Sequence, residues 1–410
     1  MAASRSRSRR SGFIAALLAA VLERVLATLP QAWYHRCGGR LSRAGRMPRG
    51  GVMHSTSVPG AAARTAVVVG AGVGGLATAL GLRRAGWQVT LLERRTALER
   101  YGTALGIHPT AQTALGRLSA DVAAALHRNG VPYRTAHVRR PDGSALARLP
   151  LDRIERKTGR PELLIFRPYL IDALVGALEA YGDVSLELGE RVEDPAGLAR
   201  DHHLVVGADG INSAVRTAFF GTRSRPRHVG TVAWIGTADR VSPVHGETWG
   251  RGRFFGMTPV EPGRTNWYAV APEATTADEL RGLFARWHDP IPRILTETDP
   301  ADRLRYEMRH LYPALPSFVH GGRVALVGDA AHAMTPNLGQ GACTALLDAE
   351  ALTRAVERHG EPGGLPAALR AYDAERRRRA QRTALASRTL HRLMTTRHTR
   401  TRDRLLRLTP

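Results

Sequence analysis

The sequence TAVVVGAGVGGL, residues 65–76, decides the fold. It begins as a short continuous apolar run, which is typical of a buried strand in a parallel sheet. The residues from Leu76 to Ala85 then carry leucines at helical spacing, and a second apolar run from Val89 to Leu92 ends at Glu93. A strand, a glycine-rich turn, a helix and a second strand in this order predict a βαβ unit, and therefore an α/β fold.

The glycines of this unit stand where a dinucleotide-binding turn needs them. Gly70 allows the tight turn, Gly72 lets the backbone approach a pyrophosphate, and Gly75 lets the helix pack closely on the strand. The start of the helix offers unpaired N–H groups and a partial positive charge to phosphates. Glu93 lies 21 residues beyond Gly72, where a carboxylate can accept hydrogen bonds from both ribose hydroxyls and repels a 2′-phosphate. The unit is therefore predicted to bind FAD or NAD rather than NADP.

Two further segments repeat the pattern of a strand, a glycine turn and a helix. They read LVVGADGINSAVR, residues 204–216, and RVALVGDAAHAMTPNLGQG, residues 323–341. An Asp after a strand can serve as a helix N-cap, but a cap does not explain three glycine turns that follow strands in one chain. In this order and spacing, the three motifs resemble the class A FAD-dependent aromatic hydroxylases, the group that contains p-hydroxybenzoate and salicylate hydroxylases. The resemblance covers about residues 64–400.

This resemblance implies an FAD-binding, Rossmann-like domain of the GR2 type, an interleaved antiparallel-sheet substrate domain and C-terminal helices. The first motif would bind the ADP half of FAD, and the Asp-Gly motif would contact both FAD and a transiently bound NADH or NADPH. The Gly-Asp motif would bind the ribityl hydroxyls, and the loop after it would lie against the isoalloxazine ring. In the family an arginine that opens a helix also contacts FAD. The cofactor-binding residues implied here are Gly70, Gly72, Gly74, Gly75, Glu93, Arg94, Arg167, Asp209, Gly210, Arg216, Gly328, Asp329, Pro336, Gly339 and Gly341.

The expected reaction is that of the cofactor itself, so no catalytic residue and no metal ligand are assigned. His332 is interpreted as structural or adjacent to FAD rather than as a base. The resemblance implies a flavin monooxygenase in which NAD(P)H reduces FAD and a flavin C4a-hydroperoxide hydroxylates a small aromatic or related electron-rich substrate with one atom of O2. An epoxidase, a halogenase or a dehydrogenase on the same fold is the alternative. The substrate, the choice between NADH and NADPH, and the oligomeric state stay open.

The chain is expected to divide into five segments. They are a basic N-terminal extension (1–62), the first part of the FAD-binding domain (63–217), the substrate domain (218–310), the second part of the FAD-binding domain (311–360) and a C-terminal helical segment (361–410). The extension is expected to be disordered or to precede a true start at Met47 or Met53, and an amphipathic helix on a membrane surface is the other interpretation.

Short alternating runs separated by Pro and Gly predict an antiparallel sheet in the substrate domain. The segment from Arg140 to Ser144 is predicted to be a hairpin turn that contributes to this sheet. Alternation alone leaves four residues open as substrate contacts or as plain core: Trp234, Arg253, Phe255 and Trp267.

The net charge of +23 is concentrated at the two ends of the chain. Residues 1–64 hold 11 arginines against one acid, and residues 374–410 hold 12 against two, whereas the residues between them are almost neutral. Nucleic-acid binding is therefore not expected, and a basic nucleic-acid or lipid-binding protein is the non-enzymatic alternative. With only two cysteines there is no disulfide framework, and no apolar run is long enough to span a membrane, so a cytoplasmic protein is expected.

Overall fold

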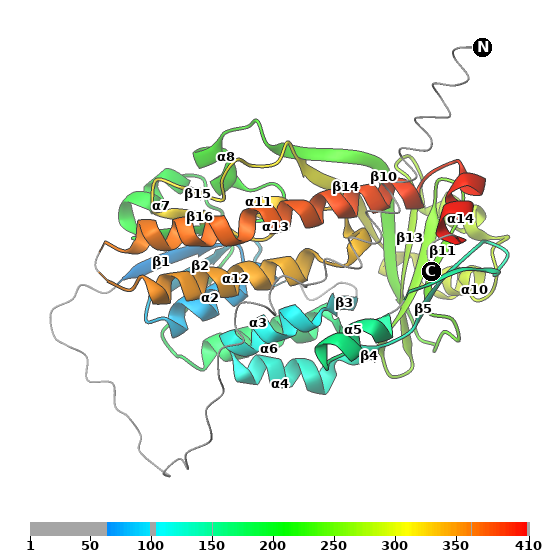
Figure 1. The fold of residues 1–410 in the computed structure, drawn as a ribbon, viewed down its shortest axis with the longest axis horizontal. Helices are drawn as coiled ribbons and strands as arrows, with labels where there is room; N and C mark the ends of the chain where they lie inside the picture. Colours follow the sequence, from blue (N-terminus) through cyan, green and yellow to red (C-terminus); the bar gives the residue numbers. More distant parts are fainter. Residues whose placement is uncertain (1–63, 99–103, 150, 362, 408–410) are drawn as a thin grey trace, which may run out of the picture. The chain divides into compact units, whose positions relative to one another are not determined.

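The structure is a computed structural model that describes residues 64–98, 104–149, 151–361 and 363–407. The predicted extension 1–62 lies outside the described residues. From Arg64 onward the described chain forms one compact unit (Figure 1). None of the helices within the described residues combines the length and apolar character that a membrane crossing requires.

A six-stranded sheet carries the three glycine motifs. Its strand order is β15-β16-β9-β1-β2-β8, and β16, β9, β1, β2 and β8 are parallel to one another. The strands are β1 (Thr65–Val69), β2 (Gln88–Glu93), β8 (Ser185–Leu188), β9 (Leu204–Gly207), β15 (Val319–His320) and β16 (Val324–Leu326). The strands β1, β9 and β16, each of which precedes a motif, are therefore direct neighbours. Because they are parallel, their glycine turns lie at the same edge of the sheet.

Long helices pack on this sheet and hold the motif turns in place. The helix α2 (Val73–Arg84) follows β1, and it packs against α12 (Gly341–Arg358), which follows the third motif. Gly81 permits this close approach, because a Cβ there would lie 1.9 Å from the hydroxyl oxygen of Thr353. The helix α13 (Leu365–Met394) runs alongside α12 and extends toward α14 (Thr399–Arg407), as Figure 1 shows. The hydroxyl of Tyr372 on α13 donates a hydrogen bond to the carbonyl of Leu326, 2.7 Å away.

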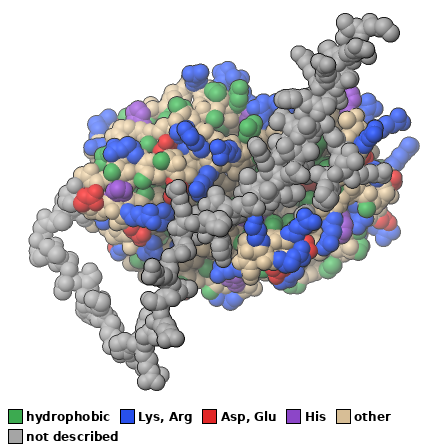
Figure 2. Space-filling model, in the orientation of Figure 1, with side chains coloured by type: hydrophobic (Ala, Val, Ile, Leu, Met, Phe, Trp, Pro, Cys, Tyr) green, Lys and Arg blue, Asp and Glu red, His purple; other side chains and the backbone are tan. Residues whose placement is uncertain are grey.

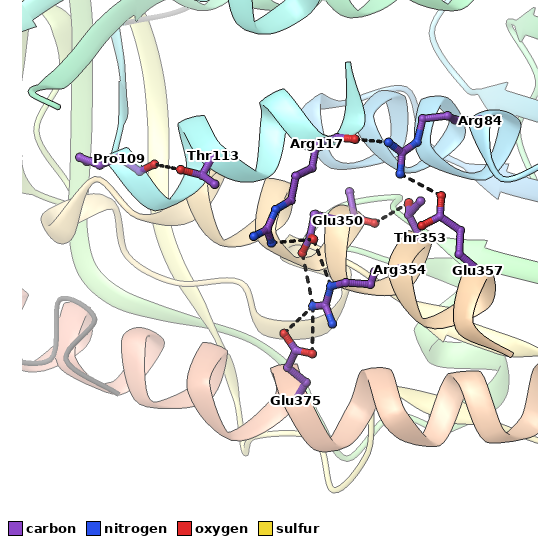
Figure 3. A network of polar contacts seen from close by, with 10 residues as sticks. Arg84, Pro109, Thr113, Arg117, Glu350, Thr353, Arg354, Glu357 and Glu375 are labelled. Atoms are coloured by element: carbon purple, nitrogen blue, oxygen red, sulfur yellow. Dashed lines mark hydrogen bonds and ion pairs between the residues drawn. The ribbon is translucent and has the colours of Figure 1, made fainter. Parts of the chain in front are cut away.

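A polar network fastens α12 to its neighbours (Figure 3). Glu350 accepts hydrogen bonds from Arg117 on α3 (Pro109–Leu118) and from Arg354, which also binds Glu375 on α13. Arg84 on α2 donates to Glu357 over 2.8 Å. Except for Glu375, these residues border a hollow of about 290 Å³. Each arginine of the network is paired with a glutamate. We therefore interpret the network as structural, holding α12 against the neighbouring helices.

A seven-stranded sheet forms the second layer, in the order β14-β10-β13-β12-β11-β5-β6. Its strands are β5 (Ala136–Arg139), β6 (Ala145–Leu149), β10 (Arg225–Ala238), β11 (Gly246–Trp249), β12 (Phe254–Glu261), β13 (Arg264–Pro272) and β14 (Leu304–Tyr312). The antiparallel sheet expected from the alternating runs is present, although β5 pairs parallel to β11. The turn expected at Arg140–Ser144 joins β5 to β6, and this hairpin adds to the sheet. One face packs on α9 (Ala277–Phe284) and α10 (Ile291–Glu297) through a second hydrophobic core.

A small three-stranded sheet, β3-β7-β4, lies beside the other face of the large sheet (Figure 1). It consists of β3 (Ala104–Ile107), β4 (Val131–Tyr133) and β7 (Glu162–Phe166), and it is followed by α6 (Arg167–Glu179). The helices α4 (Ala120–Asn129) and α5 (Leu151–Thr158) pack on it, and α7 (Pro195–Asp201) and α8 (Ala214–Phe220) flank β9. The side-chain oxygen of Asn266 on β13 accepts a hydrogen bond from the backbone N–H of Ala104, 3.3 Å away, and so ties the two sheets together.

Candidate functional site

Three turns meet at the carboxyl edge of the six-stranded sheet. The backbone N–H of Ala208 donates to the carbonyl of Val69 (2.8 Å), and that of Val327 donates to the carbonyl of Gly207 (3.0 Å). The turns after β1 and β9 touch, because a Cβ on Gly70 would lie 2.5 Å from the carbonyl oxygen of Ala208. Ligands of open α/β sheets bind at this edge, so the fold brings the three sequence motifs to one candidate site.

The glycines of the first motif divide into two kinds. Gly70 has a φ of +104°, and a Cβ on Gly75 would lie 1.8 Å from the carbonyl oxygen of Gly70, so both are needed by the fold itself. A Cβ on Gly74 would touch the side chain of Ala345 on α12 at 3.2 Å. Gly72 differs, because it has a φ of −77° and no atom lies within 4 Å of its Cβ position. The structure therefore gives no packing reason for glycine at 72, whereas a phosphate approaching the backbone would be one.

The N-terminus of α2 is open to an anion. No side chain caps it, and its first turn contains no acidic residue. Helix N–H groups without a capping side chain bind phosphates readily, because the helix dipole places partial positive charge there. This end of α2 fits the pyrophosphate of a dinucleotide.

Glu93 is buried at the end of β2 and holds the glycine loop. One carboxylate oxygen accepts from the N–H of Ala71 at 2.9 Å, and the other accepts from the N–H of Arg95 at 3.0 Å. Each oxygen has a second lone pair, so the carboxylate can still accept a ribose hydroxyl. Arg94 is exposed next to it. Their roles in FAD binding stay predictions.

We expect Glu93→Arg to lose FAD. The substitution places a cation where the carboxylate would accept two hydroxyls, and it removes the anchor of Ala71, for a loss of about 2–4 kcal/mol of binding free energy. The measurement is flavin absorbance per mole of purified protein. The control is Glu93→Gln, which keeps an acceptor for the Ala71 N–H and should lose less FAD. Full FAD occupancy in Glu93→Arg would refute the ribose assignment.

The aspartate of the second motif binds the start of a helix with one carboxylate oxygen and keeps the other unpaired. Asp209 Oδ2 accepts from the N–H groups of Ala214 (2.6 Å) and Val215 (3.2 Å) in the first turn of α8. The N-cap residue is not Asp209 but Ser213, whose Oγ accepts from the N–H of Arg216 (2.8 Å). Oδ1 of Asp209 is buried and has no hydrogen-bond partner among the described residues. Gly210 beside it has a φ of +78°, and no atom lies within 4 Å of its Cβ position. An unpaired acceptor next to open space fits a ligand that donates hydrogen bonds.

Arg216 joins the second motif to the third. Its guanidinium donates to the carbonyl of Ala330 (3.0 Å) and to that of Ile211 (2.7 Å). The side chain is buried, and this burial lowers its pKa although the charges of Asp209 and Asp329 raise it. Its described contacts are therefore structural, and direct contact with FAD stays a prediction.

The Gly-Asp motif places a carboxyl group beside two arginines. Gly328 has a φ of +59°, and Asp329 follows it at the start of α11 (Asp329–His332). Burial raises the pKa of Asp329, and the charges of His332, Arg167 and Arg216 partly offset this effect. Arg167, which opens α6, therefore lies near Asp329, and its contact with FAD stays a prediction. A shielded carboxylate among cations is a strong acceptor for hydroxyl groups, such as those of a ribityl chain.

Asp348 on α12 organises this motif, and the sequence reasoning missed it. Its Oδ2 lies 2.5 Å from His332 Nε2 and accepts from the N–H of Gly328 (3.1 Å), and its Oδ1 accepts from Arg376 Nε (2.7 Å). Burial raises the pKa of Asp348, but the charges of His332 and Arg376 outweigh this and lower it. The structure thus favours the structural interpretation of His332. The signal available in the sequence was an acid among the apolar positions of a helix.

The loop after the Gly-Asp motif ends at the open start of α12. A short 3₁₀ turn, Pro336–Leu338, leads to Gly339, which has a φ of +63°, and no side chain caps α12 at Gln340. No atom lies within 4 Å of the Cβ positions of Gly339 and Gly341. The N–H groups at this helix start suit a partial negative charge on a ring lying against the loop, which is the ring position that the sequence predicts.

The four aromatic and arginine candidates of the large sheet belong to its core. Phe255 and Trp267 stack with ring centroids 5.7 Å apart, and both lie in the cluster that packs on α9 and α10, together with Trp234. The guanidinium of Arg253 lies over the rings of Phe284 and Trp287 in the same region. They occupy the face of the sheet that points away from the small sheet. Alternation did not reveal this, because both faces of the sheet carry buried aromatic residues.

The opposite face holds ionisable groups that the sequence reasoning did not single out. They lie where β11–β13 face the small sheet, and one of them is buried while the other four are half-buried. Their pKa values are shifted from the ordinary ones, mainly by burial. Shifted groups of this kind concentrate at functional sites. The residues are His108, Tyr133, Glu162, Glu247 and Tyr268. Within the described residues, no group of three or more His, Cys, Asp or Glu is placed to hold a metal ion.

Comparison with known proteins shows what the chain is similar to. The model of the FAD binding domain family matches residues 63–387. Aurachin C monooxygenase/isomerase of Stigmatella aurantiaca is 36% identical over 341 residues, which are 77% of this chain and 86% of that protein. The 2-heptyl-3-hydroxy-4(1H)-quinolone synthase of Pseudomonas aeruginosa is 32% identical over 71% of this chain and 80% of that protein. The crystal structure of Klebsiella pneumoniae HpxO complexed with FAD and uric acid is 25% identical, covers 84% of this chain and 93% of that chain, and has a TM-score of 0.73.

Proposed function

Because the chain belongs to the class A FAD-dependent aromatic hydroxylases, we propose that its substrate is a small, electron-rich nitrogen heterocycle with a ring N–H or O–H group. The chain is an FAD-dependent monooxygenase that uses NAD(P)H. One atom of O2 enters the substrate and the other becomes water, with two electrons from NAD(P)H. The relatives support the substrate class, because one makes a hydroxylated 4(1H)-quinolone and one binds uric acid.

The observation that carries the FAD-dependent reaction is the meeting of the three glycine turns at one sheet edge, together with the open Cβ positions at Gly72, Gly210, Gly339 and Gly341. The hydride acceptance and oxygen activation are supplied by FAD when it is bound. We assign Gly72 and Glu93 to its ADP half, Asp329 to its ribityl chain and residues 336–341 to its ring. These residues would bind and orient FAD. The seven-stranded sheet would exclude water on the substrate side.

We also propose the division into FAD-binding segments (63–217 and 311–360), a substrate domain (218–310) and the C-terminal segment (361–410). The six-stranded sheet, which takes strands from residues 65–207 and 319–326, supports it. The hairpin of β5 and β6 is the exception, because it lies within 63–217 but pairs with the substrate sheet.

The non-enzymatic alternative rests on the arginine-rich ends of the chain, and residues 1–63 of these lie outside the described residues. On the described part of the face shown in Figure 2, Lys and Arg side chains stand in several groups among acidic and other side chains. Binding to nucleic acid favours a continuous basic surface.

The reaction is tested with 2-heptyl-4(1H)-quinolone and uric acid in isotopically labelled O2. We expect slow NAD(P)H oxidation alone, stimulation by at least one compound, and one labelled oxygen atom in the product, measured by mass spectrometry. A product oxygen that comes from water would refute the monooxygenase reaction. Oxidation of the substrate without any incorporated oxygen would indicate a dehydrogenase on the same fold.

A further inference from the structure

Glu162, at the start of β7, carries a nearly buried carboxyl group without a hydrogen-bond donor. Its side chain is 15% exposed, and its Oε2 lies 4.0 Å from Nε2 of His108. No described residue donates a hydrogen bond to it. Its Oε1 lies 2.4 Å from the point where a Cβ on Gly106 would stand, so the missing side chain of Gly106 on β3 makes room for it. Neither oxygen is among the fully buried polar atoms without a partner in the described residues, so the carboxyl group keeps some access to solvent and can accept a hydrogen bond from a ligand.

The position of Glu162 links it to the loop proposed to hold the flavin ring. Cys343, two residues after Gly341 on α12, donates from Sγ to the carbonyl of Gly106 (3.1 Å) and accepts from the N–H of His108 (3.4 Å). Burial raises the pKa of Cys343 to about 12, and the charge of Glu162 adds to this rise. Glu162 therefore lies beside the start of α12, the helix that follows the loop proposed to hold the flavin ring.

Glu247 on β11 is a second half-buried glutamate in the same layer. Unlike Glu162, its carboxyl group has hydrogen-bond donors. It accepts from the hydroxyl of Tyr268 and from the indole N–H of Trp249, both at 2.7 Å. Tyr268 reaches it across Gly256, which has no side chain in the way. Each carboxylate oxygen of Glu247 thus accepts a hydrogen bond within the sheet, whereas those of Glu162 accept none from the described residues.

The groups around Glu162 are uncharged near neutral pH. Burial raises the pKa of Glu162 to about 7 and lowers that of His108 to about 4. Tyr133 lies opposite Glu162 on β4, and burial raises its pKa too. Charged groups on other elements that pack on β7 are paired or exposed: Glu261 on β12 with Arg264, Glu155 on α5 with Arg134, and His127 and Arg128 exposed at the end of α4. A carboxyl group in this setting can accept and release a proton near pH 7.

We propose that Glu162 is the general base that accepts the proton of the ring N–H or O–H of the substrate during hydroxylation, an inference that rests on the proposed function. The N–H or O–H bond breaks, its electron pair stays in the ring, and the proton moves to the carboxylate. The extra electron density activates the carbon that receives the oxygen. The proton leaves Glu162 for solvent when the product departs, so the base is restored.

The first test is the pH profile of kcat/KM for the holoenzyme with 2-heptyl-4(1H)-quinolone and with uric acid. In the wild type, kcat/KM should rise with pH through a limb near 7, as a base requires. Glu162→Gln should lose this limb and fall at least ~100-fold at pH 8, because a positioned base contributes about 10²–10⁴-fold. Glu247→Gln, the matched buried control, should keep the limb. A Glu162→Gln enzyme that keeps the limb and the rate overturns the proposal.

The second test needs no substrate. A carboxyl group whose pKa is raised by folding destabilises the folded state as pH rises from its unfolded pKa to its folded pKa. Glu162→Gln holoenzyme should therefore melt at a higher temperature than wild type at pH 8.5, and the difference should shrink at pH 5. Equal melting temperatures at both pH values would overturn the buried-acid assignment. Failure of the proposed function would instead show in the wild type, as no stimulation of NAD(P)H oxidation by either compound.

Discussion

Gly72→Ala protein is expected to fold with an unchanged melting temperature as apoprotein and to bind FAD more weakly, whereas Gly75→Ala is not expected to fold. The two glycines are three residues apart in one motif, but their surroundings differ. A methyl group at 75 would overlap the carbonyl oxygen of Gly70 at 1.8 Å, and this oxygen is backbone that cannot move away cheaply. At 72 the φ of −77° is suitable for alanine, and the space is open. Only a bound pyrophosphate would meet that methyl group.

The measurements are circular dichroism and thermal melting of the apoproteins, followed by titration with FAD. The lost phosphate contacts should weaken FAD binding by roughly 10–100-fold, since each hydrogen bond to a charged group is worth about 1.5–3 kcal/mol. Gly341→Ala is a companion variant, because its Cβ position is equally open and lies at the other end of the proposed cofactor. Normal FAD affinity in Gly72→Ala would mean that the pyrophosphate does not approach this backbone.

The sequence predicted the parts of the site that depend on local pattern. Strand, glycine turn and helix are encoded by neighbouring residues, and so the turns at Gly70, Gly210 and Gly328 were all expected. That they meet at one edge follows from parallel pairing of their strands. The ends of the elements differ by a few residues between the sequence prediction and the structure. The helix expected from Leu76, for example, begins at Val73.

The substrate side could not be predicted in the same way, because it depends on which strands become neighbours. Glu162 is opposite Tyr133 and close to Gly106 only through the pairing of β7 with β4 and β3. The inward face of the large sheet is likewise set by the small sheet on one side and α9 and α10 on the other. Period-2 alternation divides the side chains of a strand between two sides of the sheet, but it does not say which side points toward the cofactor.

Asp348→Ala is expected to lower the free energy of unfolding by about 3–5 kcal/mol, because it leaves Arg376 as an uncompensated buried charge. Asp348 is fully buried, and it joins α12 to α13 through Arg376 and to the Gly-Asp turn through His332 and the N–H of Gly328. Without it, the turn that presents Asp329 loses its anchor. FAD content should therefore fall together with stability, although Asp348 itself is not assigned to the cofactor.

Thermal and denaturant melting of wild type, Asp348→Ala and Asp348→Asn test this prediction. Asn is nearly isosteric with Asp but uncharged. The stability lost in Asp348→Asn therefore measures the ion pair separately from the packing. The pH dependence gives an independent check. Since folding lowers the pKa of Asp348, its stabilisation is present above the ordinary aspartate pKa of about 4 and is lost as pH falls through the folded pKa. The melting temperatures of wild type and Asp348→Asn should therefore converge in acid. If they differ by the same amount at every pH, Asp348 stabilises the turn by geometry alone, and the ion pair with Arg376 contributes nothing.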